Sequence, residues 1–166
     1  AIEIAAEKGA KAILFIMSKP GGILQCGVSN FEGTPAPVPA FTITYEEGKW
    51  MQRLIARGKQ VKLTIETQSF CTPTESRNIV ATLPGKSDAK IVIGAHFDAW
   101  DLGNGGVDNG YGTAILYDVA RLMKTYANRN EYTVEFVWFN GEELGLWGSR
   151  KYVERHRDEE ILAMIN

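Results

Sequence analysis

The amino-acid sequence predicts an α/β protein, with a small α/β unit followed by part of a larger α/β domain. From about residue 78 onward, strand-like apolar runs alternate with segments of helical periodicity, which implies parallel strands joined by right-handed crossovers. A shorter set of elements precedes them, and the polar, proline-containing segment 67–77 separates the two sets. The chain of 166 residues is long enough for one substantial core or two small ones.

The first 44 residues predict the short elements of a packing unit without reactive groups. We expect a helix over residues 2–8, ended by Gly9, and strands over residues 12–17 and 41–44. Between these strands, residues 22–39 contain three prolines whose spacing prevents a helix.

A second helix is predicted to begin at about Tyr45, because Thr44 and Glu47 have the spacing of a capping box. Apolar residues at helical spacing mark its expected buried face: Met51, Leu54 and Ile55. Gly58 ends this helix, and the alternation over residues 60–66 is typical of an exposed edge strand.

The second set of elements has the order strand, strand, helix, strand, helix. The expected bounds are 78–83, 90–95, 109–126, 132–139 and 144–156. Within the first of these helices, one stripe is expected to lie on the sheet: Ile115, Val119, Leu122 and Tyr126. The closing residues 161–166 resemble the beginning of another strand, and the chain opens without Met in a helical pattern. We therefore expect both ends to be cut.

Composition excludes several classes of partner. A net charge of −2 gives no electrostatic case for nucleic acid or an anionic membrane. No apolar run approaches the roughly 20 residues of a membrane span. Cys26 and Cys71 are too far apart for a CxxC motif, which favours two ordinary thiols over a disulfide.

Polar side chains follow two of the predicted strands at the points where the strands end. One group follows the strand 90–95: His96, Asp98, Asp101 and Asp108. Glu142 and Glu143 follow the strand 132–139. Ligands bind beyond the carboxyl ends of such strands, and imidazole and carboxylate are ligands of hydrolytic zinc sites. Either motif alone could be a polar turn or surface charge, but their combination favours a metal site.

Each of these residues has a chemical role open to it. Asp108, in a glycine-rich loop, has two carboxylate oxygens and can bridge two cations. Asp98 can accept the other N–H of the His96 imidazole and so fix its tautomer. Of Glu142 and Glu143, one can ligate a metal while the other accepts the proton of a metal-bound water.

The segments HFDAWDLGNGGVDNGYG and WFNGEELGLWGS resemble the M28 family of co-catalytic zinc aminopeptidases and carboxypeptidases. The resemblance implies two zinc ions, with His96 as a ligand of one, Glu143 as a ligand of the other, and Asp108 bridging both beside a cis bond to Asn109. It also implies Glu142 as the general base and Asp98 as the support of His96. The fold implied is the zinc-exopeptidase α/β/α mixed sheet.

The function implied by the resemblance is hydrolysis of a peptide bond at a chain terminus. An aminopeptidase is expected ahead of a carboxypeptidase, with a peptide as substrate and export from the cell as the localisation. Two further ligands, an Asp and a His, would lie beyond Asn166. We therefore expect this chain alone to bind zinc weakly and to have little activity, which a nanomolar zinc titration would contradict. His156 is expected to be a solvated mid-helix residue.

The earlier segments AAEKGAKAILFI and VPAFTITYEEGKWMQRLIARGKQVKLTIE are similar to the protease-associated domain that accompanies some of these peptidases. The resemblances imply an incomplete protease-associated-like domain over residues 1–68. Residues 69–166 would be the truncated N-terminal part of the catalytic domain.

Three alternative functions compete with the peptidase. A nucleotide-binding loop is disfavoured because Asp108 occupies the position of the third glycine of GxGxxG, and the acidic residues would repel phosphate. A non-catalytic, receptor-like relative would be expected to lose ligands, yet this sequence keeps the following four site residues: His96, Asp108, Glu142 and Glu143. A single-zinc cyclotransferase on the same fold stays open.

Overall fold

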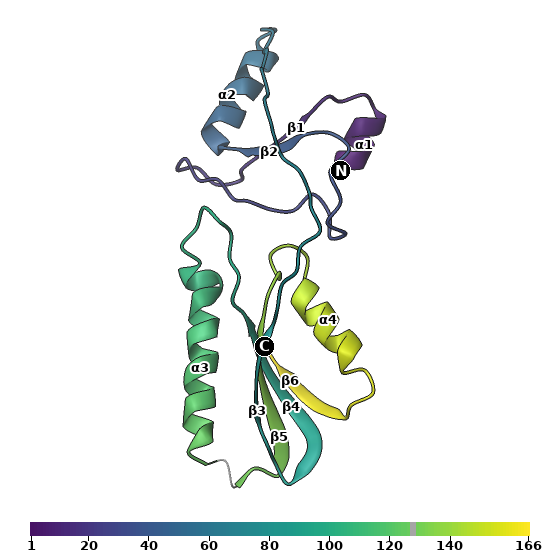
Figure 1. The fold of residues 1–166 in the computed structure, drawn as a ribbon. Helices are drawn as coiled ribbons and strands as arrows, with labels where there is room; N and C mark the ends of the chain where they lie inside the picture. Colours follow the sequence, from purple (N-terminus) through teal and green to yellow (C-terminus); the bar gives the residue numbers. More distant parts are fainter. Residues whose placement is uncertain (127–128) are drawn as a thin grey trace. The chain divides into compact units, whose positions relative to one another are not determined.

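The structure is a computed structural model that describes residues 1–126 and 129–166. The chain forms two compact units, Ala1–Pro73 and Thr74–Asn166 (Figure 1). The division falls inside the polar segment 67–77. The comparison of the first unit with a protease-associated domain stays a prediction.

The first unit consists of two helices and a two-stranded sheet. Its elements are α1 (Ile2–Glu7), β1 (Ile13–Ile16), β2 (Ala40–Ile43) and α2 (Tyr45–Ala56). The strands are parallel, with Ile13 opposite Ala40. At the start of α2, the Glu47 amide donates to Thr44 Oγ1 over 3.2 Å, and the Thr44 amide donates to the Glu47 carboxylate over 3.3 Å. The predicted capping box and its helix are therefore confirmed.

Two expectations for this unit were wrong. Residues 60–66 form no strand, because no other strand of the described residues lies beside them, and alternation without a partner does not make a strand. Ile55 is exposed rather than buried on α2. Helix α2 rises away from the two short strands, so its C-terminal turns do not lie on the sheet (Figure 1).

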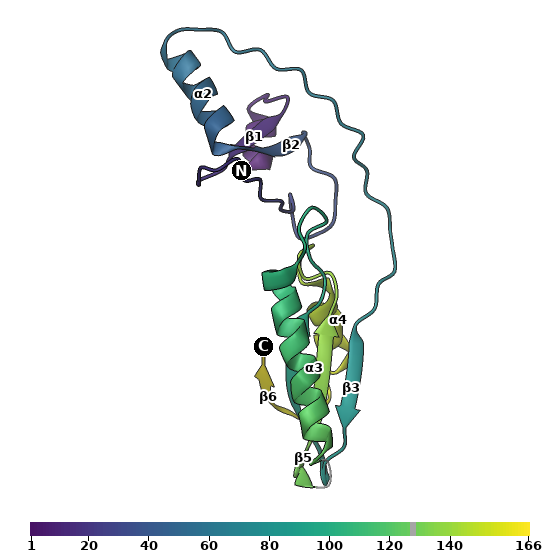
Figure 2. The same cartoon turned by 90° about the vertical axis from the view of Figure 1, so that its left-hand side faces the viewer.

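The second unit is a three-layer α/β/α structure around a mixed four-stranded sheet. The strands are β3 (Ile79–Leu83), β4 (Ser87–His96), β5 (Tyr132–Phe139) and β6 (Ile161–Ile165), in the spatial order β3-β5-β4-β6. Strand β4 runs parallel to β5 and β6, whereas β3 is antiparallel to β5. Helices α3 (Tyr111–Lys124) and α4 (Trp147–Arg155) cover opposite faces of the sheet (Figures 1 and 2). The predicted mixed sheet is confirmed.

Strand β5 is buried on both faces. Alternate side chains, Phe136 and Trp138 among them, pack with Leu116 of α3. The side chains between them, Val137 and Phe139, pack with Tyr152 of α4. This strand therefore joins the two layers of the core.

The buried stripe of α3 includes Val119, as predicted, but otherwise differs from the predicted one. Leu116 is 3% exposed, whereas Leu122 is 48% exposed and Ile115 is also exposed. Thr113 explains the difference, because its hydroxyl donates to His96 O over 2.9 Å and its carbonyl accepts from Trp138 Nε1 over 3.2 Å. These two bonds fix the rotation of the helix. Residues three, seven and ten positions after Thr113 then face the sheet: Leu116, Ala120 and Met123.

Both helices of the second unit begin later than predicted. Helix α3 begins at Tyr111, after the turn Gly106–Gly110. Helix α4 begins at Trp147 rather than at residue 144, since Leu146 has a φ of +62°, which no right-handed helix allows. Glu142 and Glu143 consequently lie in a loop and not in a helix.

His156 lies at the C-terminal end of α4, and the expectation of a solvated mid-helix residue was wrong. Its ring stacks on Tyr152 with 4.1 Å between ring centroids, and its Nδ1 lies 2.9 Å from the Glu159 carboxylate. The ring is thus packed against the helix that it ends.

Cys26 and Cys71 are free thiols, as favoured by the sequence. Among the described residues, no helix has both the length and the apolar character needed to cross a membrane.

Candidate metal centre

The predicted site residues are placed by the ends of two neighbouring parallel strands. His96 is the last residue of β4, and it lies opposite Phe139, the last residue of β5. Asp108 lies in the turn that leads into α3, and the two glutamates lie in the loop after β5. Because β4 and β5 are parallel, all these segments meet at one edge of the sheet.

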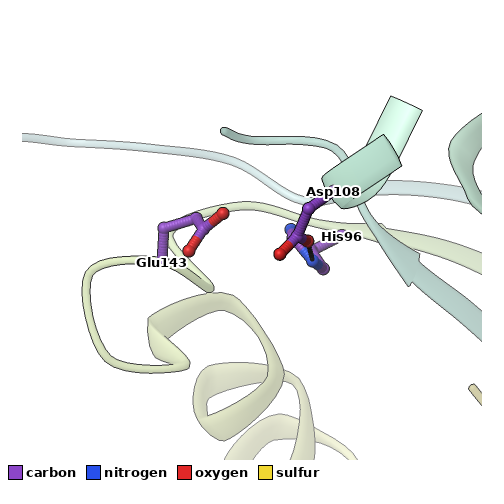
Figure 3. Close-up of side chains that lie close together, drawn as sticks. All are labelled: His96, Asp108 and Glu143. Atoms are coloured by element: carbon purple, nitrogen blue, oxygen red, sulfur yellow. Dashed lines mark ion pairs between the residues drawn. The ribbon is translucent and has the colours of Figure 1, made fainter. Parts of the chain in front are cut away.

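Three of the side chains form a cluster with the donor atoms of a metal site. His96, Asp108 and Glu143 each offer one ligand atom, and these atoms all lie within 4.8 Å of one another (Figure 3). The distance from His96 Nε2 to Asp108 Oδ1 is 3.0 Å. Glu142 lies beside the cluster, with its Oε2 3.9 Å from His96 Nε2.

Asp98 has a different set of partners from the one expected. His96 Nδ1 lies 3.1 Å from the backbone carbonyl oxygen of Asp98, and 3.6 Å from its carboxylate. Since a carbonyl oxygen only accepts, Nδ1 donates in this contact, and Nε2 is the ring nitrogen that faces the cluster. The support of His96 therefore comes mainly from the backbone of Asp98.

The Asp98 carboxylate holds the backbone of the two glutamates. Its Oδ1 accepts from the Glu142 amide over 3.2 Å, and its Oδ2 accepts from the Glu143 amide over 3.1 Å. The sequence did not predict this contact, because the backbone amides of a loop have no signal in the identity of its residues. One side chain thus links the end of β4 to the acids after β5.

The cluster concentrates negative charge. Burial raises the pKa of Glu143 above its ordinary value, and the Asp108 and Glu142 carboxylates raise it further, against the opposing effect of His96. Asp101, the remaining acid of the loop, is exposed and does not belong to the three-residue cluster. Carboxylates held this close to one another favour a cation between them.

The turn that carries Asp108 has a specific backbone. Gly105 has a φ of +60°, and the peptide bond between Asp108 and Asn109 is cis, as the family resemblance implied. The Asn109 side chain accepts a hydrogen bond from the Gly112 amide over 3.0 Å at the start of α3. Asp108 is therefore fixed relative to the helix, although its own side chain is 75% exposed.

The donor set suits a metal ion. One imidazole nitrogen and two carboxylates are typical ligands of a hydrolytic zinc site, in which one coordination position stays open. The orientation of the His96 ring, with Nε2 toward Asp108, agrees with this use.

The α/β/α unit and the donor atoms at one edge of its sheet agree with a family of metal-dependent peptidases. Residues 78–166 match the model of peptidase family M28, and the chain belongs to this family.

Named relatives include both kinds of exopeptidase. The chain is 29% identical to mouse carboxypeptidase Q over 134 residues, which are 79% of this chain and 28% of that protein. It is 34% identical over 125 residues to leucine aminopeptidase 2 of Trichophyton equinum, covering 75% of this chain and 25% of that protein.

Two solved peptidase structures are also similar to this chain. A peptidase M28 precursor from Shewanella amazonensis superposes with a TM-score of 0.76 at 32% identity. A zinc aminopeptidase from Bacillus subtilis superposes with a TM-score of 0.66 at 25% identity. Each match covers 92% of this chain and 36% of the solved chain. The chain thus spans between a quarter and about a third of the length of these four relatives.

Proposed function

We propose that the protein hydrolyses the peptide bond at one end of a peptide, as a metallo-exopeptidase with two zinc ions. The observation that carries the proposal is the cluster of His96, Asp108 and Glu143, with a second glutamate beside it. Membership of peptidase family M28 supports the same conclusion. The activity is proposed for the whole protein, because the chain covers only part of each relative.

The ligands of the proposal are the three residues of the cluster. His96 would hold one zinc through Nε2, and Glu143 would hold the other. Asp108, whose Oδ1 lies 3.0 Å from His96 Nε2, would contact both. When bound, zinc would polarise the scissile carbonyl of the substrate and would lower the pKa of a water molecule to about 7.

Glu142 is the proposed general base. Its carboxylate is 34% exposed and lies beside the cluster, so it can reach both the reacting water and the substrate. It would take a proton from that water and deliver it to the leaving amine. Asp98 assists by holding the amides of both glutamates, which fixes the distance of Glu142 from the cluster.

The proposed substrate is a peptide with a free amino terminus. The aminopeptidases among the relatives and solved structures favour this choice, while carboxypeptidase Q is the alternative at the other end of a peptide. Paired substrates decide between them. An aminopeptidase would cleave an amino-acid anilide with a free amine and would spare an N-acetylated peptide with a free carboxylate. Export from the cell, implied by the family resemblance, is also part of the proposal.

The roles of the two glutamates are tested by replacing each with glutamine in the whole protein. Glu142→Gln should lower kcat by about 10²- to 10⁴-fold while zinc content is unchanged, because it removes a base and no ligand. Glu143→Gln should lower zinc content as well as kcat. Zinc content is measured by metal analysis after gel filtration. Loss of zinc from Glu142→Gln, with retention in Glu143→Gln, would mean that the two roles are exchanged.

A further inference from the structure

The two glutamates lie in a loop that is closed at its neck. We call residues 140–148 the acid loop, and we call its two ends, residues 140–141 and 147–148, its neck. The Gly148 amide donates to Asn140 O over 2.9 Å, and the Trp147 amide donates to Gly141 O over 3.0 Å. Both ends of the loop therefore lie side by side, and whatever holds the neck also orients the acids.

Asn78 holds both ends of the acid loop at once. Its Oδ1 accepts from the Asn140 amide over 3.0 Å, and its Nδ2 donates to Gly148 O over 2.8 Å. The sheet brings it there, because Ile79 of β3 lies opposite Trp138 of β5, so Asn78 lies level with the end of β5. The donor and the acceptor of one amide side chain are both used.

The neck is packed closely against this side chain. A Cβ atom at position 148 would collide with Asn78 Oδ1 and with Asn140 O, so only glycine fits there. The Asn140 side chain strengthens the neck, since its Nδ2 donates to Ser76 Oγ over 2.5 Å and its Oδ1 accepts from the Gly141 amide over 2.8 Å.

The acid loop is thus held at two places. Asn78 holds the neck, and the Asp98 carboxylate holds the amides of Glu142 and Glu143 within the loop. Asp98 belongs to the cluster region, whereas none of the hydrogen bonds or ion pairs of Asn78 reaches His96, Asp108 or either glutamate. Any effect of Asn78 on the site must pass through the loop backbone.

We propose that Asn78 is a positioning residue for the metal centre: by joining Asn140 to Gly148, it sets the place of Glu142 and Glu143. The consequence for turnover rests on the proposed function, but the consequence for the loop does not. Without Asn78, the Asn140 amide and the Gly148 carbonyl lose their side-chain partners, and the neck can open. A displacement of about 1 Å at reacting groups can cost about 10²-fold in rate.

The test that does not depend on activity is hydrogen exchange in the metal-free full chain. In Asn78→Ala, exchange of the amides of residues 140–148 should rise at least about tenfold, while the central amides of β5 stay protected. Asn130→Ala is the matched control. Asn130 precedes the other end of β5, and its Nδ2 has no hydrogen-bond partner among residues 1–126 and 129–166, so the acid loop should keep its wild-type exchange.

Asn78→Asp distinguishes the two hydrogen bonds of Asn78, to the Asn140 amide and to Gly148 O. It also replaces Asn78→Ala in the test if the alanine variant does not fold. The aspartate keeps an acceptor for the Asn140 amide but has no N–H for Gly148 O. Protection should persist at Asn140 and fall at the helix end of the loop. Wild-type exchange throughout the acid loop in either folded variant would overturn the proposal.

Kinetics then separate positioning from plain structural support. Per folded, zinc-loaded molecule, Asn78→Ala should lower kcat about tenfold or more and leave KM within about threefold. If kcat per loaded molecule is unchanged, Asn78 supports the fold alone and the proposal fails. If the wild-type protein has no peptidase activity but the loop exchange rises as expected, the proposed function fails while the positioning of the loop stands.

Discussion

Lys90→Met should destabilise the second unit strongly, because it leaves a buried carboxylate without its cation. Lys90 Nζ lies 2.6 Å from Glu135 Oε1 and 2.5 Å from the Glu159 carboxylate. Glu135 lies in the middle of β5, is 5% exposed and also accepts from the Tyr152 hydroxyl. Removing the ammonium therefore isolates a negative charge between the sheet and α4.

The expected cost at pH 7 is about 3–5 kcal/mol in the free energy of unfolding, the range for breaking a buried ion pair by removing one partner. The matched control is Lys86→Met, because Lys86 and Glu131 form a pair of similar length, 2.9 Å, with side chains 68% and 63% exposed. That exposed pair should contribute about 0–1 kcal/mol. The double variant Lys90→Met/Glu135→Gln should recover most of the loss, since it removes the isolated charge.

The cost should also depend on pH. Burial raises the pKa of Glu135, but hydrogen bonds from Lys90 and Tyr152 outweigh it and hold this pKa below the ordinary 4.5. In the wild type, Glu135 therefore contributes stability above pH 4.5 that is lost as pH falls through its folded-state pKa. Without Lys90, its hydrogen bond and its charge no longer lower the pKa of Glu135, so the folded-state pKa should rise and the stability that Glu135 contributes above pH 4.5 should shrink. The cost of Lys90→Met should be larger at pH 7 than at pH 4.

Lys90 has the opposite dependence in the wild type. Burial lowers its pKa, but its bonds to Glu135 and Glu159 outweigh this and raise it above 10.5. Its contribution is complete below pH 10.5 and is lost as pH rises through its folded-state pKa. Urea unfolding of the protein, followed by tryptophan fluorescence at pH 4 and pH 7, measures the cost of Lys90→Met and its dependence on Glu135, since the Lys90 contribution is constant over this range. A cost no larger than that of Lys86→Met at pH 7, or an equal cost at both pH values, would refute the reasoning.

Two further substitutions test the packing of each unit. Leu116→Ala should lower the free energy of unfolding by about 2–5 kcal/mol, because this side chain is buried between α3 and the sheet. Leu122→Ala, on the exposed side of the same helix, should cost under about 1 kcal/mol. Equal losses in urea unfolding would mean that the helix is rotated from the orientation described. Thr44→Ala removes the hydroxyl that caps α2 and should lower the free energy of unfolding by about 1 kcal/mol, whereas Thr44→Ser keeps a hydroxyl and should keep the stability. An unchanged midpoint of thermal unfolding for the first unit of Thr44→Ala would contradict the capping role.

The sequence was most informative where one local rule decides the structure. Thr44 and Glu47 predicted the start of α2 because the capping box depends on two residues three positions apart. The strand 132–139 was predicted with its bounds, since β5 is buried on both faces and its apolar run is nearly continuous. The proximity of His96 to Asp108 was expected from the predicted parallel topology together with the family resemblance.

Features that depend on distant partners were not predicted. The alternation of residues 60–66 had no information about whether a neighbouring strand exists. Two apolar stripes share α3, and the choice of Leu116 over Ile115 is made by the contacts of Thr113 with two strands. Asn78 showed no signal at all, because a lone amide at the start of a strand is ordinary until its partners at positions 140 and 148 are known.

Thr113 also connects two properties that are usually engineered separately. The same residue bonds to the carbonyl of His96 and receives the indole of Trp138, so the hydrophobic interior and the imidazole share an anchor. Any repacking beneath α3 that turns the helix would also shift Asp108 relative to His96. Attempts to make the domain more heat-resistant by redesigning this interior should therefore monitor the candidate metal centre, whose geometry would change even though none of its residues had been replaced.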